Sequence, residues 1–330
     1  MITFWQQIDG MLQKCDKTGI DPEKNLWVDA RSVTKDDITV LRNDYGIEMD
    51  DIVDILDQEE LSRVERDDSY TLIVLRAPVA SDDAGVPYFT VPLGIVFYGK
   101  ALITVCWTDC EVLRGISSRR IKDLDLSDFA AFAIQILNRS SLLFLRCLKE
   151  INRRSNVIQN ELQVSIENDA LLELLNLEKS LVLFTTSLSS NQLLIEKLLR
   201  SSILTWDQND REWLNDVEID NRQAIEMART YSNILMGTIE SFASVISNNL
   251  NVIMKKLTVI SLVLMIPTFI VSFFGMNVPL PFAGKGHLGT VIISGICIVS
   301  MCIATLFLRN KPVQTLRRYH RSKNRKGGLK

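Results

Sequence analysis

The sequence predicts an α+β protein: a mixed α/β region followed by long helices, the last two of which cross a membrane. Three features of the 330-residue chain predict this class. All 40 Asp and Glu residues precede residue 241, and two uncharged apolar runs lie beyond that point. The third feature is the distribution of charge, which is acidic in the first part of the chain and basic in the last. Residues 1–256 hold 27 Lys and Arg against 40 acids, a net of −13, whereas residues 257–330 hold ten Lys and Arg and no acid, a net of +10.

Residues 1–125 are predicted to form a cytosolic α/β domain. Four β-rich segments alternate with two helical stretches: Leu26–Asp29, Thr71–Leu75, Gly94–Tyr98 and Leu102–Cys106 are the strands, Lys35–Asn43 and Glu48–Leu56 the helices. The sequence contains neither a glycine-rich phosphate loop nor a catalytic Ser, His and Asp set, so no enzyme is predicted. Residues 1–5 show no basic segment followed by an apolar core, and no cleaved signal is expected.

The six cysteines are scattered without a framework spacing (Cys15, Cys106, Cys110, Cys147, Cys297 and Cys302). The pair Cys106 and Cys110 allows a metal site as one interpretation. However, residues 103–107 read as a buried strand, and the two histidines, His287 and His320, lie far along the chain. We therefore predict reduced thiols that serve in packing.

Two helical regions follow the α/β domain. Residues 126–207 are predicted to form a cytosolic helical hairpin that turns near residues 167–169, and residues 208–256 a stalk helix. Apolar residues recur along the stalk at roughly helical spacing, among them Val217, Ile225, Ala228, Leu235 and Val245. This periodicity predicts packing against neighbouring helices.

Residues 257–274 and 288–308 are predicted to be transmembrane helices. Their 18 and 21 uncharged residues reach about 27 and 32 Å, enough to cross a hydrocarbon core of about 30 Å. A pair of buried core helices is the alternative, but the basic residues that bound the two runs favour a bilayer. The connecting turn, residues 275–287, is too short for a domain and forms an outer loop.

Basic residues predict the orientation of the two spans. Lys255 and Lys256 precede the first span and nine cations follow the second, whereas the outer loop contributes only Lys285. Both termini are therefore expected in the cytoplasm of a multi-pass protein of the inner (plasma) membrane. The basic tail, residues 309–330, directly follows an apolar run, which favours anionic lipid headgroups over nucleic acid as its partner.

A stripe of polar and thioether residues follows the first span. Its members are separated by alternating steps of three and four residues: Asn251, Met254, Thr258, Ser261, Met265, Thr268 and Ser272. This spacing of 3.5 is typical of a helix that faces partner helices along its length. Several copies placed around an axis would turn the stripe into the lining of a water-filled channel. Close helix packing through small hydroxyl residues is the alternative.

The triplet Gly275-Met276-Asn277 at the outer end of the first span resembles the signature of the CorA family of divalent-cation channels. Its surroundings add to the resemblance: residues 254–258 begin the span, Pro267-Thr268 lies in its middle, and an aromatic residue precedes Gly275. Upstream segments are similar too, including residues 26–29, 54–57, 63–65 and 179–182. The resemblance covers essentially the whole chain.

The resemblance implies a funnel-shaped homopentamer with a stalk helix that continues into a pore. It implies that Asn277 forms the selectivity ring at the mouth, that Gly275 and Met276 shape its turn, and that a further set lines the pore: Thr268, Met265, Leu257, Met254 and Asn251. Ser272 and Ser261 join this set through the stripe. The function expected is passive uptake of hydrated Mg²⁺, closed by cytosolic Mg²⁺.

The residue types agree with such a function. Mg²⁺ gives up its waters reluctantly, and neutral Asn carbonyls would bind a hydrated ion more weakly than carboxylates. The outer loop departs from many family members because it lacks an acid and contains Lys285. A zinc-transporting branch shares the architecture, so Zn²⁺ or broad divalent-cation transport, with or without coupling to protons, stays an alternative. A non-conducting membrane scaffold is another.

The resemblance also implies a regulatory metal site. Asp216 falls where the family places a stalk carboxylate that binds Mg²⁺ between subunits. Its partner is expected in the loop after residues 71–75, where Asp82 or Asp83 is the nearest match. Mg²⁺ bridging these acids would neutralise repulsion between subunits and stabilise the closed state. A surface Asp without a role is the alternative.

Overall fold

The computed structural model describes residues 1–8, 10–81, 85–117, 125–164, 168–201, 203–204, 206–276 and 287–309. The chain divides into two compact units, Met1–Ser241 and Phe242–Lys330. One helix, α6 (Gln208–Phe274), contributes to both. It is the longest element of the chain and carries the predicted stalk and the first predicted span.

The first unit is built on a seven-stranded sheet with the strand order β2-β1-β3-β7-β6-β5-β4. Its strands are β1 (Ile2–Ile8), β2 (Met11–Cys15), β3 (Leu26–Arg31), β4 (Arg63–Arg66), β5 (Thr71–Ala80), β6 (Tyr88–Tyr98) and β7 (Ala101–Cys106). The central pair β3 and β7 is parallel, and every other pair is antiparallel. The sheet is therefore mixed.

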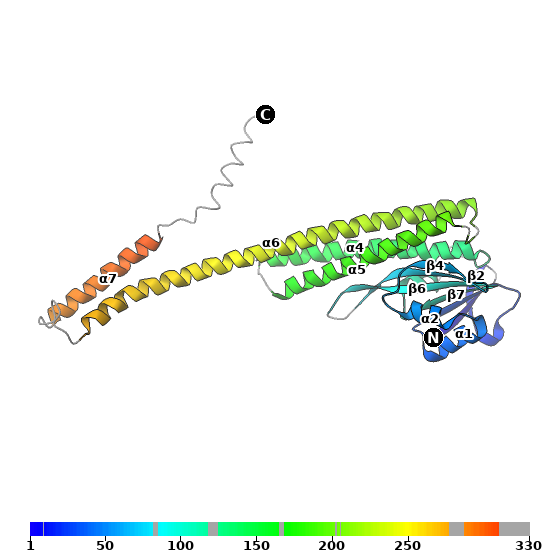
Figure 1. Ribbon diagram of the computed structural model, residues 1–330, viewed down its shortest axis with the longest axis horizontal. Coiled ribbons are helices and arrows are strands. Elements are labelled where there is room, and N and C mark those ends of the chain that lie inside the picture. The colour runs from blue at the N-terminus through cyan, green and yellow to red at the C-terminus, as the bar shows by residue number, and fades with distance from the viewer. Residues whose placement is uncertain are drawn as a thin grey trace, which may run out of the picture. The chain divides into compact units, whose positions relative to one another are not determined.

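Helices cover both faces of this sheet (Figure 1). On one face lie α1 (Lys35–Tyr45) and α2 (Met49–Leu56); on the other, α4 (Phe129–Val164) and α5 (Asn168–Arg200) pack on β5 and β6. Alternate residues of β3 face opposite sides of the sheet. Val28 joins the core beneath α1 and α2, whereas Trp27 packs against Phe132 of α4, with ring centroids 5.3 Å apart and the rings tilted by 57°. Strands buried on both faces need continuous apolar sequence, and the predicted strands have it.

Local sequence signals set the ends of the helices on the first face. Thr34 caps α1, accepting from the backbone N–H of Asp37 while the Asp37 side chain accepts from Thr34. Gly46 ends α1 with a positive φ of 65°, a conformation that favours glycine. Gly94 of β6 admits the side chain of Ile55, since a Cβ there would lie 2.6 Å from Ile55 Cδ1. These positions fix α1 and α2 against the sheet.

A charged network lies where the parallel pair β3 and β7 ends. Arg31 donates to both carboxylate oxygens of the buried Asp29, and its Nη1 donates to Asp109 at 2.9 Å. Arg114 of α3 (Glu111–Ser117) donates to the same Asp109 at 2.6 Å. Burial raises the pKa of Asp29 even though Arg31 opposes that rise. The network joins the sheet to α3.

The four predicted strands and the helix predicted at Lys35–Asn43 are present with longer bounds, whereas the helix predicted at Glu48–Leu56 begins one residue later, at Met49. A 3₁₀ turn, Lys17–Gly19, follows β2. The strands β1, β2 and β4, which complete the sheet at its two edges, were not predicted. The six cysteines are free, with Cys106, Cys110 and Cys147 buried. The second unit holds the end of α6 and the helix α7 (His287–Arg309).

Candidate ion-conduction site

Three helices of the described chain are long and apolar enough to cross a membrane. They are Phe129–Leu162 within α4, Gln208–Phe274 and Gly289–Leu306 within α7. The most apolar stretch of α4 is 67% buried inside the protein, which fits a core helix of the first unit. The corresponding stretches of α6 and α7 are 0% and 11% buried. These two helices are therefore the ones whose apolar surface is left for lipid or for other copies of the chain.

In the second unit α7 runs back along the end of α6 (Figure 1). Only one face of α6 between residues 257 and 274 is partly covered, and it consists of Val259, Val263, Pro267, Ile270 and Phe274; every other residue of this segment is exposed. Of the described residues of α7, the two that are buried are small, Gly289 and Ala304. Cys297 Sγ lies 4.0 Å from the carbonyl oxygen of Pro267, midway along the contact.

The predicted polar stripe lies on the opposite side of α6 from α7. At about 100° per residue, the stripe and the covered face are centred about 180° apart. All seven stripe residues, Asn251, Met254, Thr258, Ser261, Met265, Thr268 and Ser272, are exposed, with Met254 and Met265 at 59% and 62%. Leu257 lies at the edge of the stripe, about 60° from its centre. The α6–α7 contact therefore leaves the polar stripe uncovered.

Two hydroxyl groups of the stripe are hydrogen-bonded within the helix. Thr258 Oγ1 donates to the carbonyl oxygen of Met254, and Thr268 Oγ1 to that of Leu264, both at 2.8 Å. Such bonds satisfy the only donor of a hydroxyl group and leave its lone pairs outward. The resemblance assigned no role to Thr258. Its position in the stripe spacing was the signal that identified it.

The helix α6 ends directly before the Gly-Met-Asn triplet. Gly275 N–H donates to the carbonyl oxygen of Val271 at 3.0 Å, and a Cβ at this position would lie 3.3 Å from the same atom. Met276 is 54% exposed. Asn277, the predicted selectivity residue, lies outside the described residues, as do the outer loop to residue 286 and the basic tail from residue 310.

The predicted regulatory acids are only partly described. Asp216 is exposed on the part of α6 that belongs to the first unit, with Glu212 and Asp220 one turn before and after it on the same helix face. Asp82 and Asp83 lie outside the described residues, between β5 and β6. Within the described part of the chain, no group of three or more His, Cys, Asp or Glu is arranged to hold a metal ion.

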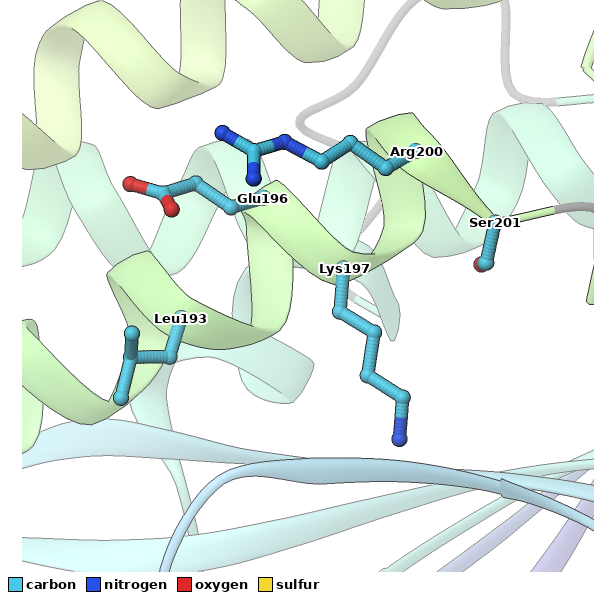
Figure 2. Close-up of a pocket in the computed structure, with 5 residues that line it drawn as sticks. All are labelled: Leu193, Glu196, Lys197, Arg200 and Ser201. Carbon is cyan, nitrogen blue, oxygen red and sulfur yellow. The ribbon is translucent and has the colours of Figure 1, made fainter.

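A hollow of about 360 Å³ lies at the end of α5 in the first unit (Figure 2). It is lined by Leu193, Glu196, Lys197, Arg200 and Ser201. Lys197 and Ser201 point toward the sheet, whereas Glu196 and Arg200 point to another side of the helix. Lys197 Nζ donates to the carbonyl oxygen of Val64 at 2.9 Å, which ties α5 to the edge strand β4. This lysine serves the fold.

One protein family matches this chain across both of its units. The CorA-like Mg²⁺ transporter protein family matches residues 22–310. The cobalt/magnesium transport protein CorA of Methanocaldococcus jannaschii is 24% identical over 302 residues, which are 90% of this chain and 94% of that protein. The magnesium transport protein CorA of Helicobacter pylori is 23% identical over 275 residues, 79% of this chain and 83% of that one.

Solved structures show the same fold. The complete structure of the CorA magnesium transporter from Methanocaldococcus jannaschii matches with a TM-score of 0.78 at 24% identity, over 94% of this chain and 98% of that chain. The full-length CmaX protein matches with a TM-score of 0.69 at 14% identity, over 94% and 97%. The cytoplasmic domain of ZntB from Vibrio parahaemolyticus matches with a TM-score of 0.55 at 15% identity, over 76% and 97%.

Proposed function

Because the chain belongs to the CorA-like Mg²⁺ transporter family, we propose that copies of it assemble around an axis and conduct hydrated Mg²⁺ along the polar stripe of α6. The protein is a CorA-type membrane transporter and not an enzyme. The observation that carries the proposed path is the position of the stripe, whose seven residues are all exposed and lie opposite α7. A helix that holds α7 on one side and polar groups on the other suits a pore lining with α7 outside it.

The remaining two sides of α6 support self-association. Between the stripe and the face covered by α7 lie two flanks of exposed apolar side chains: Ile260, Leu264 and Val271 on one, Leu262, Ile266 and Phe269 on the other. In a ring each flank would meet the opposite flank of the next copy. We take the ring to be a homopentamer, with both termini in the cytoplasm and the tail, residues 309–330, at anionic headgroups.

The end of α6 supplies the outer mouth with a partial negative charge. Aligned peptide dipoles leave the carboxyl end of a helix with about half an elementary charge, and α6 ends at Phe274. Several such ends around one axis would attract cations although the outer loop contains Lys285 and no acid. Asn277 would then bind the hydrated ion through its side-chain carbonyl without removing the waters that Mg²⁺ retains.

Two observations support the transport of divalent metals other than Mg²⁺. Two relatives that resemble this chain are named cobalt/magnesium transport proteins, and the stripe presents the thioethers of Met254 and Met265, which suit softer metals than Mg²⁺. Co²⁺ and Zn²⁺ are therefore the competing substrates.

A flux assay on the full-length protein in liposomes tests the function. We expect Mg²⁺ uptake that hexamminecobalt blocks, and its loss in Asn277→Ala. The matched control is Asn160→Ala, an exposed asparagine of α4, which should transport normally. Faster Zn²⁺ than Mg²⁺ uptake that depends on a proton gradient would favour the zinc alternative. No flux of any divalent cation would favour a scaffold and end the proposal.

A further inference from the structure

One polar side chain interrupts the buried face of α6 in the first unit. Beyond the first turn of this helix, buried residues recur at steps of three, four or seven: Leu214, Val217, Asn221, Ala224, Ala228 and Leu235, with Ile225 beside them. This spacing is that of a seam between packed helices. Every one of these residues is apolar except Asn221, which is 0% exposed.

The side-chain amide of Asn221 binds α5 through both of its hydrogens. Its Nδ2 donates to Leu188 O and to Gln192 Oε1, each at 3.0 Å. The orientation of the two amides follows from their partners. Gln192 Nε2 donates to Glu196 Oε1 at 3.0 Å and to Glu218 Oε1 at 2.9 Å, and ionised carboxylates only accept. Gln192 must therefore turn its oxygen toward Asn221, which in turn presents its nitrogen.

The same stretch of α5 is bound to the sheet on its other side. Ser187 Oγ accepts from Nε of Arg76 in β5 at 3.3 Å, and Asn191 Oδ1 accepts from the backbone N–H of Arg76 at 2.8 Å. Leu188 and Gln192, which bind Asn221, are the next residues along the chain. Polar contacts thus connect β5, α5 and α6 at one level of the first unit. The position of α6 on α5 is therefore also its position relative to the sheet.

Asn221 is not the residue that would make this seam most stable. Its Oδ1 is buried and has no hydrogen-bond partner among the described residues, and a buried acceptor without a partner is destabilising. What an asparagine adds to an apolar seam is a unique alignment of the two helices. A purely apolar seam can slip by three or four residues and still bury apolar side chains. The same slip would carry Asn221 away from Leu188 O and Gln192 and leave its whole amide unpaired.

We propose that Asn221 is a positioning residue that fixes the axial register of α6 against α5. A slip of three or four residues would displace α6 along its axis by about 5–6 Å. The helix continues without a break to Phe274, so the register at Asn221 also determines how far the rest of α6 extends beyond α5. This inference holds whether or not the polar stripe of α6 conducts ions.

Distances between two spin labels test the register in the full-length protein, purified in detergent. The labels are attached to cysteines introduced at Arg200 of α5 and Asn233 of α6, both exposed. The two helices run in opposite directions (Figure 1), and each label lies twelve residues after the contact of Leu188 with Asn221. The distance between the labels therefore follows axial displacement. Labelled copies are diluted with unlabelled ones, so that only distances within one copy are measured. The less buried native cysteines are replaced by alanine: Cys15, Cys297 and Cys302.

We expect one distance in the protein with the native Asn221. Asn221→Leu should add a second distance, shifted by about 5–6 Å. Its midpoint of thermal unfolding should not fall, because the seam then contains no buried polar side chain. Asn215→Leu makes the same substitution at an exposed position of α6 and should keep the single distance.

Asn221→Ala is the second variant, because alanine cannot overpack the seam. It should also show two distances, with a lower midpoint. A single, unshifted distance in both Asn221 variants would overturn the inference and leave Asn221 as an ordinary contact between α5 and α6. If Asn221→Leu does not fold, the alanine variant decides by the same criterion.

Discussion

Asn191 of α5 pairs with both backbone groups of Arg76 in β5. Its Oδ1 accepts from Arg76 N–H at 2.8 Å and its Nδ2 donates to Arg76 O at 2.9 Å. The side chain stands where a strand would otherwise lie, because β4 pairs with β5 only as far as Val74 and the residue opposite Arg76 on β6 is Pro92, which has no N–H. A helix side chain thus completes the sheet.

Replacing Asn191 with alanine should therefore destabilise the first unit. The buried N–H of Arg76 would lose its partner, whereas Arg76 O would keep Ser140 as a donor, and a buried group left unsatisfied costs about 1–3 kcal/mol. The midpoint of thermal unfolding of the purified protein in detergent measures the loss. Asn160→Ala, at an exposed position of α4, should change stability by less than about 0.5 kcal/mol. Equal midpoints for the two variants would show that the pairing of Asn191 with Arg76 does not stabilise the first unit.

The contact between α6 and α7 depends on small residues of α7. Ala304 is 9% exposed, so Ala304→Leu should overpack the contact and lower stability by about 1–3 kcal/mol. Ser294→Leu makes a similar increase in volume at an exposed position of the same helix and should be nearly neutral. Thermal unfolding in detergent compares them. A Ser294→Leu variant as unstable as Ala304→Leu would mean that α7 packs through a different face.

The network at the end of β3 and β7 should make stability depend on pH. Burial works to raise the pKa of Asp109, but hydrogen bonds from Arg114 and Arg31 hold it below the ordinary value. A carboxyl group with a lowered folded pKa contributes stability above its unfolded pKa of about 4, and this contribution is lost as the pH falls through the folded pKa. Arg114→Gln should therefore reduce the loss of stability below about pH 4, by less than 1 kcal/mol because both side chains are about half exposed.

Thermal midpoints between neutral and acidic pH measure this difference. Arg42→Gln, at an exposed arginine of α1, is the control and should keep the wild-type pH profile. The interpretation of the network would be wrong if Arg114→Gln steepened the loss of stability in acid.

The regulatory role proposed for Asp216 has a simple electrophysiological test. If Mg²⁺ held by Asp216 and a neighbouring copy stabilises a closed state, Asp216→Ala should raise severalfold the cytosolic Mg²⁺ concentration that halves the current. Asp169→Ala removes an exposed carboxylate from α5 and should leave that concentration unchanged. Patch recordings in which both variants close like the wild type would leave Asp216 as a surface residue without this role.

Sequence periodicity predicted the parts of the fold that local patterns encode. The apolar runs of β5 and β7 and the stripe of α6 can be read directly, because a strand buried on both faces is apolar along its length and one face of a helix repeats at the helical period. The edge strands β2 and β4 and their neighbour β1 were missed because they are only partly buried and mix polar with apolar residues, as in Gln6, Gln7 and Glu65. Their assignment depends on pairing with distant segments, which local periodicity does not contain.

The candidate site, like the fold, could be predicted only in part from the sequence. The stripe predicted which face of α6 is polar, but not which face α7 covers. That required the partly buried positions Val259, Val263 and Pro267 and the contact of Pro267 with Cys297. The internal bonds of Thr258 and Thr268 likewise belong to the side-chain geometry and not to the residue types. The assignment of Asn277 came from resemblance to the family, and it stays a prediction.

Aqueous accessibility along the span of α6 tests the central claim most directly. Single cysteines would be introduced in a protein whose less buried cysteines, Cys15, Cys297 and Cys302, are replaced by alanine, and a charged thiol reagent applied after reconstitution. We predict reaction at the stripe, namely at Asn251, Met254, Thr258, Ser261, Met265, Thr268 and Ser272, and none at Val259, Val263 or Ile270. Unreactive stripe positions, or equal reactivity on all faces of the helix, would contradict a water-filled path along α6.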